Sequence, residues 1–366
     1  MTDTDARAVR GGSAEPEAGT VPDMPGGALS GANKPAAVRM YEMLYSSLVS
    51  QLLVVAVELG LADALADGPR DVDDLAEAAG AHPGALYRAM RALASVGVFT
   101  ETAPRTFGHT GLSETLRGDA ESSMADLARY VALPARQRAF GAVGHSVRTG
   151  HPAFDHEHGM SWWEYFAADP AIATLFNRAM GGMARMVNSA VLESYDFGRC
   201  RHLVDVGGGQ GHLVAMIAQR FPDLTAVVFD LARVVPEAEA VVAEAGIGGR
   251  VRCEGGDFLE AVPAGGDTYV VSWTLHDWDD ADAVRILANI RAVLPPGGEV
   301  VVIDEVPPGG DAPHFGKFQD IVMLTLLKGR IRDAREWAPL FERAGLHLRE
   351  VRATSSPTSV LVAERA

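Results

Sequence analysis

Cysteine and basic side chains are scarce in this sequence. The 366 residues include two cysteines, Cys200 and Cys253, which are too few for a disulfide scaffold and compatible with a reducing cytosol. Only 32 Lys and Arg stand against 48 Asp and Glu, which gives a formal net charge of −16. Because such a charge repels polyanions, nucleic acid is not expected as a partner.

Long apolar runs are also missing. The longest uninterrupted aliphatic stretch near the start, 52–57, is much shorter than the roughly 18 apolar residues of a membrane span. The first residues are acidic and polar, without the basic start and apolar core of a secretory signal. These features predict a soluble cytoplasmic protein that has no membrane partner.

The composition, with 48% hydrophobic residues, is typical of a globular chain of about two domains. Residues 1–35 are rich in Gly, Pro, Ala and acidic side chains, which predicts a disordered tail. We expect an N-terminal domain over 36–118, a helical substrate-binding or linker region over 119–195 and a catalytic domain over 196–366.

The N-terminal domain has the pattern of a winged helix. An apolar helix over 36–57 precedes two capped helices and a hairpin over 98–110. A winged helix suggests a DNA-binding regulator, but nine acidic residues against five basic ones between 52 and 118 disfavour duplex binding. We therefore interpret this domain as a dimerisation or lid module and keep the regulator as an alternative.

The middle region is predicted to be helical, with a loop over 149–159 and an aromatic cluster after it. This cluster could be part of the hydrophobic core or could line a pocket for a flat aromatic ligand. It contains Trp162, Trp163 and Phe166, and Met180 follows farther along the chain. Four imidazoles flank or occupy the loop, but their spacing is not that of a metal site. They are His145, His151, His156 and His158.

From residue 201 onward, apolar strands alternate with helices. This alternation predicts a doubly wound α/β fold with a parallel sheet. The expected strands are 203–206, 225–230, 250–253, 268–273 and 299–304, and the expected helices are 213–220, 234–244 and 281–293.

A glycine-rich loop follows the first of these strands. Gly207, Gly209 and Gly211 let a ligand approach the backbone at the start of a helix. A dinucleotide fingerprint would need glycine at position 212, which is His212. Asp205 before the loop would repel a pyrophosphate but suits an ammonium or sulfonium centre, which favours S-adenosylmethionine over NAD.

Six motifs occur in the order seen in S-adenosylmethionine-dependent O-methyltransferases of the caffeate and bacterial polyketide-tailoring type. From about residue 36 to the C-terminus the chain resembles that family. The resemblance implies a Rossmann-like seven-stranded methyltransferase sheet, an N-terminal all-helical winged-helix dimerisation domain, and a homodimer. The motifs are 205–211, 229–231, 256–258, 275–278, 296–298 and 336–337.

The resemblance also implies roles for individual residues. His276 matches the family's catalytic base, and Asp304 matches the carboxylate that orients it, with Glu305 as the neighbouring possibility. The cofactor would be held by Asp205, Gly207, Gly209, Gly211, Asp230, Leu231, Gly256, Asp257, Phe258, Ser272 and Trp273. An aromatic substrate would meet Trp162, Trp163, Phe166, Asn177, Met180, Asp277, Met323, Leu324 and Leu327.

The chemistry of a phenol supports this interpretation. A phenol with a pKa near 10 is only about 0.1% ionised at neutral pH, so a histidine against the hydroxyl can take its proton as the methyl group transfers. We expect SN2 transfer to a hydroxyl of a polyketide-like or phenolic small molecule, with S-adenosylhomocysteine as the second product.

One position departs from the family pattern. Many members have a second acidic residue in a Gly-Lys-Glu-Arg-like segment, and Ile331 stands there in this chain. An isoleucine can neither orient an imidazole nor bond a substrate. Because relatives of the same fold perform hydroxylation or decarboxylation, a non-methylating tailoring enzyme is the alternative.

Overall fold

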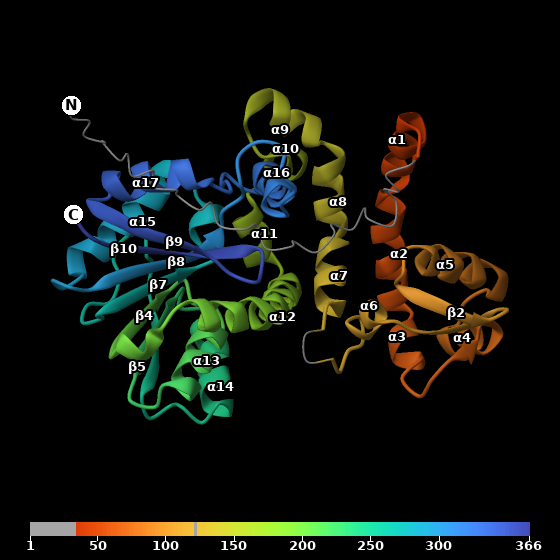
Figure 1. Cartoon of the computed structure of the whole chain (residues 1–366), viewed down its shortest axis with the longest axis horizontal. Helices are drawn as coiled ribbons and strands as arrows, with labels where there is room; N and C mark the ends of the chain where they lie inside the picture. Colours follow the sequence, from red (N-terminus) through yellow and green to blue (C-terminus); the bar gives the residue numbers. More distant parts are fainter. Residues whose placement is uncertain (1–33, 121–122) are drawn as a thin grey trace, which may run out of the picture.

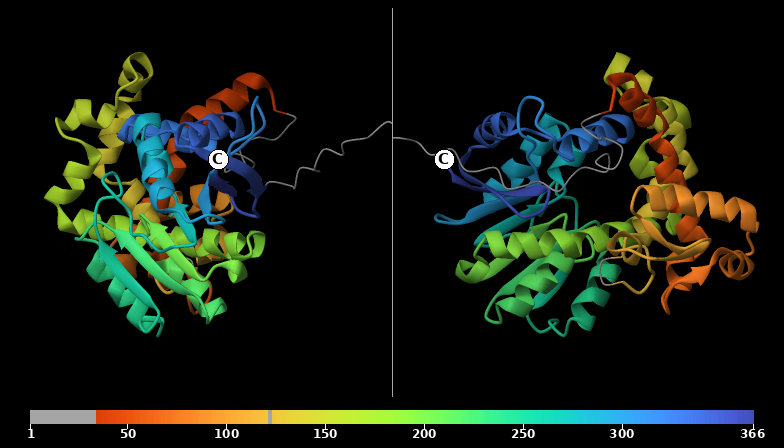
Figure 2. Two further views of the ribbon diagram at one scale, coloured as in Figure 1. Left: turned by 90° about the vertical axis from the view of Figure 1, so that its left-hand side faces the viewer. Right: turned by 45° about the vertical axis from the view of Figure 1, so that its right-hand side comes forward.

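The computed structural model describes residues 34–120 and 123–366, apart from the side chains of residues 183, 185 and 186 (Figure 1). Almost all of the tail predicted over 1–35 lies outside the described residues. The N-terminal domain and the sheet domain stand at opposite ends of the molecule, and a group of helices connects them (Figure 2).

The N-terminal domain contains the predicted helices and hairpin. Its helices are α1 (Ala36–Tyr45), α2 (Ser47–Glu58), α3 (Leu61–Ala64), α4 (Val72–Ala79), α5 (Pro83–Ser95) and α6 (Gly111–Glu114). The hairpin of β2 (Phe99–Ala103) and β3 (Thr106–His109) gains a third strand, β1 (Arg70–Asp71), so the domain is mostly rather than wholly helical. Asp71 caps α4 by accepting the backbone N–H of Asp73, and His82 caps α5.

The helix predicted over 36–57 is divided at Ser46 into α1 and α2. None of the α1 side chains is buried, and its apolar residues Met43 and Leu44 are 63% and 72% exposed. Residues 36–58 together are long and apolar enough to cross a membrane, the one such helix that the described part of the chain contains. An apolar surface of this kind is typical of a contact site for another chain.

Six helices form the middle region. They are α7 (Ala125–Val131), α8 (Pro134–Gly141), α9 (Val143–Thr149), α10 (Ala153–His158), α11 (Trp162–Ala168) and α12 (Pro170–Ser194). The loop predicted over 149–159 is wrong, because residues 153–158 form α10, which ends at Gly159 with φ at +68°. The His145 and His156 rings stack, and the His158 ring contacts the Ala135 carbonyl, so packing accounts for these imidazoles.

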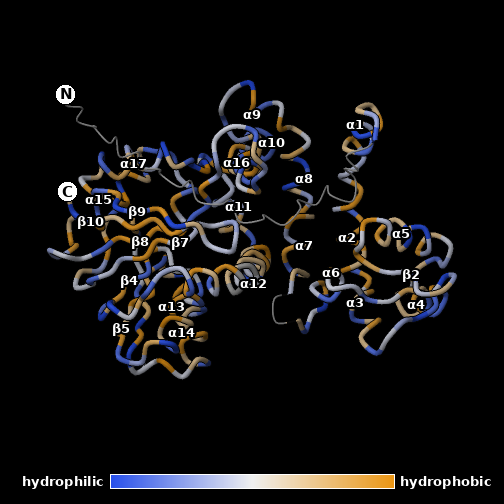
Figure 3. Tube along the Cα trace, in the orientation of Figure 1, coloured by the Kyte–Doolittle hydropathy of each residue, from blue (hydrophilic) through white to orange (hydrophobic). Residues whose placement is uncertain are grey.

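The C-terminal half is the predicted seven-stranded sheet, in the order β6-β5-β4-β7-β8-β10-β9. Five strands are parallel and occupy the predicted positions within two residues: β4 (His202–Val206), β5 (Thr225–Asp230), β6 (Val251–Gly255), β7 (Thr268–Ser272) and β8 (Glu299–Glu305). The antiparallel β10 (Thr358–Arg365) lies between β8 and β9 (Leu346–Ala353). The sheet is buried on both faces, and its central strands are strongly hydrophobic (Figure 3).

Alternate residues of each strand face opposite layers of helices. Val301 and Ile303 pack with α12, α13 (His212–Arg220) and α14 (Val235–Glu244), whereas Val300 and Val302 pack with α15 (Asp280–Val293) and α17 (Ala334–Arg343). The remaining helix, α16 (Gly316–Leu326), packs against α8 and α10 and so joins the sheet domain to the middle region.

Candidate functional site

The glycine loop lies at the carboxyl edge of the sheet, where the strand order reverses between β4 and β7. Gly207, Gly209 and Gly211 all have positive φ, between 54° and 77°. A Cβ on Gly207 would lie 2.8 Å from Oγ1 of Thr274, so only glycine fits there without a shift. Open α/β sheets bind ligands at such a switch point.

Two carboxylates flank this loop. Asp205 is 1% exposed, and its Oδ1 has no hydrogen-bond partner within the described chain. Burial, with the nearby charge of Asp230, raises the pKa of Asp205 to about 7. Asp230 accepts the N–H groups of Gly209 at 2.9 Å and Leu231 at 2.7 Å, and burial raises its pKa as well.

These features fit S-adenosylmethionine. An unpartnered buried carboxylate oxygen is the complement of a cationic ammonium or sulfonium. The carboxylate of Asp230, already oriented by two backbone N–H groups, retains lone pairs for the ribose hydroxyls. The loop backbone would hold the methionine part, because its glycines present no Cβ to a ligand.

The other residues predicted to bind the cofactor occupy the same edge. Asp257 is exposed and accepts the N–H of Leu259, while Phe258 packs edge to face against Trp278. Gly256 packs so closely on the Phe229 ring that a Cβ would lie 2.6 Å from it. Ser272 ends β7, and Trp273 follows with φ at +49° and a buried Nε1 that has no described partner.

The imidazole of His276 is placed by a single helical turn after β7, residues 275–277. Its Nδ1 lies 2.7 Å from Oδ1 of Asp304 at the end of β8, as the resemblance implied. Its Nε2 faces Oδ1 of Asp277 at 3.5 Å. An Nδ1–H donated to Asp304 leaves Nε2 as the nitrogen that can accept a proton.

Several carboxyl groups surround this imidazole. Burial alone would lower the pKa of His276, but the charges of Asp304, Asp277 and Glu305 outweigh it and raise the pKa to about 9. Burial raises the pKa of Asp277 to about 6 and that of Glu305 to about 7. Glu305 is 2% exposed, and the described residues offer its Oε2 no partner. The cluster therefore favours a positive charge at its centre.

The segment with Ile331 packs directly against the histidine turn. Ile331 is buried, and its N–H donates to Asp320 of α16 at 2.8 Å. A Cβ on Gly329 would lie 1.9 Å from the carbonyl oxygen of His276, which no side chain could tolerate. The isoleucine thus supports the backbone near the imidazole without a polar contact to it.

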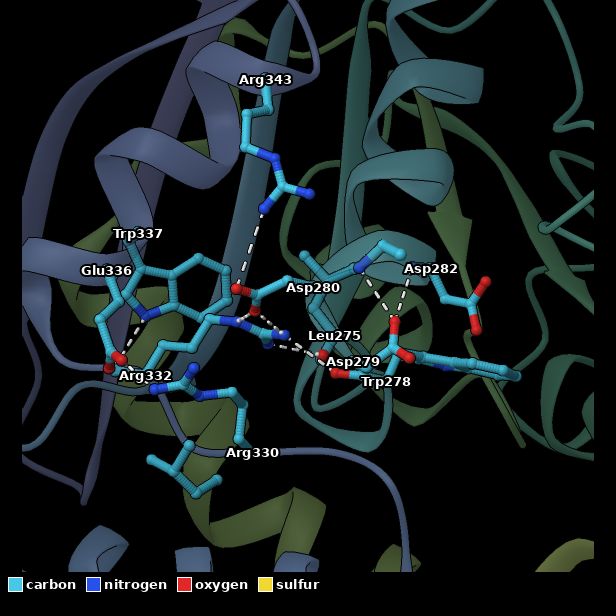
Figure 4. Close-up of polar contacts among 12 residues, drawn as sticks. Leu275, Trp278, Asp279, Asp280, Asp282, Arg330, Arg332, Glu336, Trp337 and Arg343 are labelled. Carbon is cyan, nitrogen blue, oxygen red and sulfur yellow. Dashed lines mark hydrogen bonds and ion pairs between the residues drawn. The ribbon is translucent and has the colours of Figure 1, made fainter. Parts of the chain in front are cut away.

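Arg332 was missed by the sequence reasoning. Its guanidinium, 1% exposed, donates to the carbonyls of Leu275 and Trp278 at 2.9 Å, on both sides of His276 (Figure 4). The same guanidinium donates from Nε and Nη2 to Oδ1 of Asp280 at 3.0 and 2.9 Å. One side chain thereby fixes both ends of the histidine turn. Arg332 directly follows Ile331 in the segment compared with the family pattern, but its carbonyl partners are joined to it only by the fold.

The predicted substrate residues do not all lie together, and Asp277 is the one beside His276. One aromatic cluster, built from α7, α8, α10, α11, α12 and α16, contains Trp162, Trp163, Phe166, Met180 and Leu327. Met323 is buried on α16, and Leu324 is half-buried beside it. Asn177 lies elsewhere: its Nδ2 donates to Glu237 of α14 at 2.6 Å, and Gln210 of the glycine loop donates to the same oxygen.

Family models cover most of the chain. Residues 140–347 match the model of an O-methyltransferase domain, and residues 41–119 match that of an O-methyltransferase dimerisation domain.

Curated relatives extend over nearly the whole length. The phenazine O-methyltransferase PhzM of Lysobacter antibioticus is 39% identical over 88% of this chain and 95% of its own. The mitomycin biosynthesis 6-O-methyltransferase of Streptomyces lavendulae is 37% identical over 94% of this chain and 98% of its own. The aclacinomycin 10-hydroxylase RdmB of Streptomyces purpurascens, at 35% identity, covers 84% of this chain and 83% of its own.

Solved structures show the same fold. The crystal structure of LaPhzM superposes with a TM-score of 0.85 at 38% identity, over 91% of this chain and all of that one. The O-methyltransferase NcsB1 from neocarzinostatin biosynthesis, in complex with S-adenosylmethionine and 2-hydroxy-5-methyl naphthoic acid, gives a TM-score of 0.72 at 33% identity, over 87% of this chain and 96% of that one.

We expect an Asp205→Asn variant to change the pH dependence of stability. The pKa of Asp205 is about 7 in the folded protein and ordinarily 3.8, so the folded wild type loses stability as pH rises from about 4 to 7. The variant should gain about 4 kcal/mol relative to wild type at pH 8 and almost nothing near pH 4. Urea unfolding at both pH values measures this, with the exposed Asp223→Asn as control. A constant difference between wild type and variant would contradict it.

We expect Arg332→Met to lower the free energy of unfolding by about 2 to 4 kcal/mol, because it leaves the carbonyls of Leu275 and Trp278 without a donor and leaves Asp280 with only its 3.9 Å contact to Arg343. Arg330 is the matched control, since its ion pair with Glu336 is exposed and Arg330→Met should cost less than about 1 kcal/mol. Urea titration compares the two variants. Equal losses would show that Arg332 does not fix the turn.

Proposed function

The chain belongs to the O-methyltransferase family, and we propose that it transfers a methyl group from S-adenosylmethionine to a hydroxyl of an aromatic small molecule, with His276 as general base. The observation that carries the role of His276 is the 2.7 Å contact between its Nδ1 and Asp304, at the sheet edge that also holds the glycine loop. The solved complex of NcsB1 with S-adenosylmethionine supports the cofactor.

His276 and Asp304 have different roles in the proposed methyl transfer. Asp304 holds the imidazole in the tautomer with Nδ1–H, so the lone pair of Nε2 can accept the substrate's hydroxyl proton. The bound cofactor supplies an electrophilic methyl carbon and a neutral thioether as leaving group. The substrate oxygen forms the new bond to that carbon while its proton moves to Nε2, and Asp304 stabilises the imidazolium that results.

The pKa of His276, about 9, sets a condition on this role. A raised pKa favours the imidazolium form of His276 in the free enzyme, and an imidazolium has no lone pair to accept a proton. A second positive charge bound at the same edge of the sheet would lower this pKa, because like charges disfavour protonation. We therefore infer that cofactor binding and deprotonation of His276 are coupled.

The aromatic cluster supports a flat, ring-containing substrate. Tyr130, Trp162, Phe166 and Phe176 pack within ring distances of 4.7 to 6.1 Å, and Met180 and Leu327 adjoin them. Such side chains form the walls of pockets for planar ligands. Two relatives, a phenazine O-methyltransferase and a mitomycin biosynthesis O-methyltransferase, agree with an antibiotic-like aromatic substrate.

The non-methylating alternative is not favoured. Ile331, in place of the family's acidic residue, is the reason to consider this alternative. The hydroxylase among the relatives shows that a similar chain can have a different activity. The two relatives of higher identity are methyltransferases, and the isoleucine leaves the pair of His276 and Asp304 intact. The mass of the product separates the reactions: methyl transfer adds one methylene, hydroxylation an oxygen.

We expect His276→Ala to slow methyl transfer by about 10²- to 10⁴-fold, because the variant has no group to take the hydroxyl proton. Labelled S-adenosylmethionine with a panel of phenols measures the rate. Asp304→Asn should also slow the reaction, since it disturbs the tautomer. Calorimetric binding of S-adenosylhomocysteine to His276→Ala is the control for folding. An alanine variant as active as wild type would rule out the base.

We also propose a homodimer formed through α1 and α2, which expose apolar side chains and lie mostly within the match to a dimerisation domain. The double variant Leu44→Glu and Leu48→Glu should sediment as a monomer, because it places four charges in each interface. Val351→Glu, an exposed apolar position on β9, should leave the dimer intact. A wild type that stays monomeric at every concentration would contradict the proposal. The cytoplasmic location stays a prediction.

A further inference from the structure

Arg136 is a cation buried among aromatic rings. It lies on α8, is 5% exposed, and its guanidinium carbon is 4.1 Å from the ring centre of Tyr130. The rings of Phe140 and Trp162 are 5.5 and 5.8 Å away. Its Nε is buried, and no atom of the described chain accepts a hydrogen bond from it.

No acidic group of the described chain compensates this charge. Burial lowers the pKa of Arg136, and among the described ionisable groups only Tyr130 acts in the opposite direction. Arg332, which is as deeply buried, has a carboxylate and two carbonyls as acceptors. In contrast to Arg332, Arg136 has no carboxylate partner in the described chain, and its Nε–H has no acceptor there, although the rings around it attract a guanidinium.

The surroundings of Arg136 connect it to the candidate active site. Tyr130 and Trp162 belong to the same aromatic cluster as Met180 and Leu327. The charge of Asp277, which faces Nε2 of His276, acts on the phenol of Tyr130. Tyr130 therefore lies near both Arg136 and the carboxylate beside the base.

We propose that Arg136 binds a carboxylate carried by the aromatic substrate, so that the substrate class is the hydroxylated aromatic acids. This proposal rests on the proposed function. The planar guanidinium presents paired N–H donors that match a carboxylate, and the pairing would neutralise the buried charge. The aromatic ring would pack among the side chains of the cluster, with the hydroxyl directed toward His276.

Binding to the full-length protein saturated with S-adenosylhomocysteine tests the proposal without turnover. The probes are 1-hydroxy-2-naphthoate and 1-naphthol, which differ only in the carboxylate, and hydroxybenzoate with phenol as a smaller pair. Calorimetry should show that at least one acid binds wild type about tenfold or more tightly than its neutral partner. A wild type without that preference in either pair would overturn the proposal.

Substitutions then assign the preference to one side chain. Arg136→Met keeps the length and removes the charge, so it should abolish the preference for the acid and leave the affinity for the neutral partner within about twofold. Arg136→Lys should retain part of the preference, because it keeps the charge without the paired donors. Arg138→Met, an exposed position on the same helix, should behave as wild type.

Thermal unfolding separates recognition from packing. Removing an uncompensated buried charge should leave the Tm of Arg136→Met equal to or above that of wild type. A lower Tm with equal losses for acid and neutral partner would identify Arg136 as a packing residue and overturn the proposal. Failure of the proposed function looks different: no probe is methylated, although the preference for the acid persists.

Discussion

Backbone contacts too close for any side chain hold the candidate active site together. The loop at Gly207 lies against Thr274, and the segment at Gly329 lies against the carbonyl of His276, both within distances that a Cβ would violate. These contacts join three regions that are far apart in the sequence: the turn after β4, the turn after β7 and the segment after α16. The contact of His276 with Asp304 depends on these neighbours, because the imidazole is carried by a single helical turn, which is too short to hold its own position.

The distribution of charge gives the site its preference for cations. Five acidic residues are buried or nearly so at the carboxyl edge of one sheet: Asp205, Asp230, Asp277, Asp304 and Glu305. Most other acidic residues in the described part of the chain are at least partly exposed. Only a fraction of the net charge of −16 therefore concerns function. The buried guanidiniums of Arg332 and Arg136 differ in their partners: Arg332 is paired with a carboxylate and two carbonyls, whereas Arg136 in the middle region has no carboxylate partner in the described chain and an Nε without an acceptor.

The parallel strands and the glycine loop follow from the sequence pattern, whereas the contact of His276 with Asp304 was implied by the family resemblance, with Glu305 as the alternative. Strands buried on both faces appear as continuous apolar runs, and motifs at their carboxyl ends must converge at one edge. The helix α10 could not be predicted, because its histidines and bounding glycines favour a loop locally and packing on α8 overrides them. Arg332, Arg136 and the bond from Asn177 to Glu237 were also out of reach, because each depends on partners brought together only by the fold.

The position of β10 has a consequence for the order of folding. β8, which carries Asp304 and Glu305, is covered on one side by β7 and on the other by β10, whose Ser359 is in register with Asp304. During synthesis β8 is thus made long before the strand that completes it, and its free edge offers unpaired backbone groups throughout that interval. The strand that carries Asp304 gains its second neighbour only after residues 358–365 have been added, so we expect the contact of Asp304 with His276 to be among the last features of the domain to form.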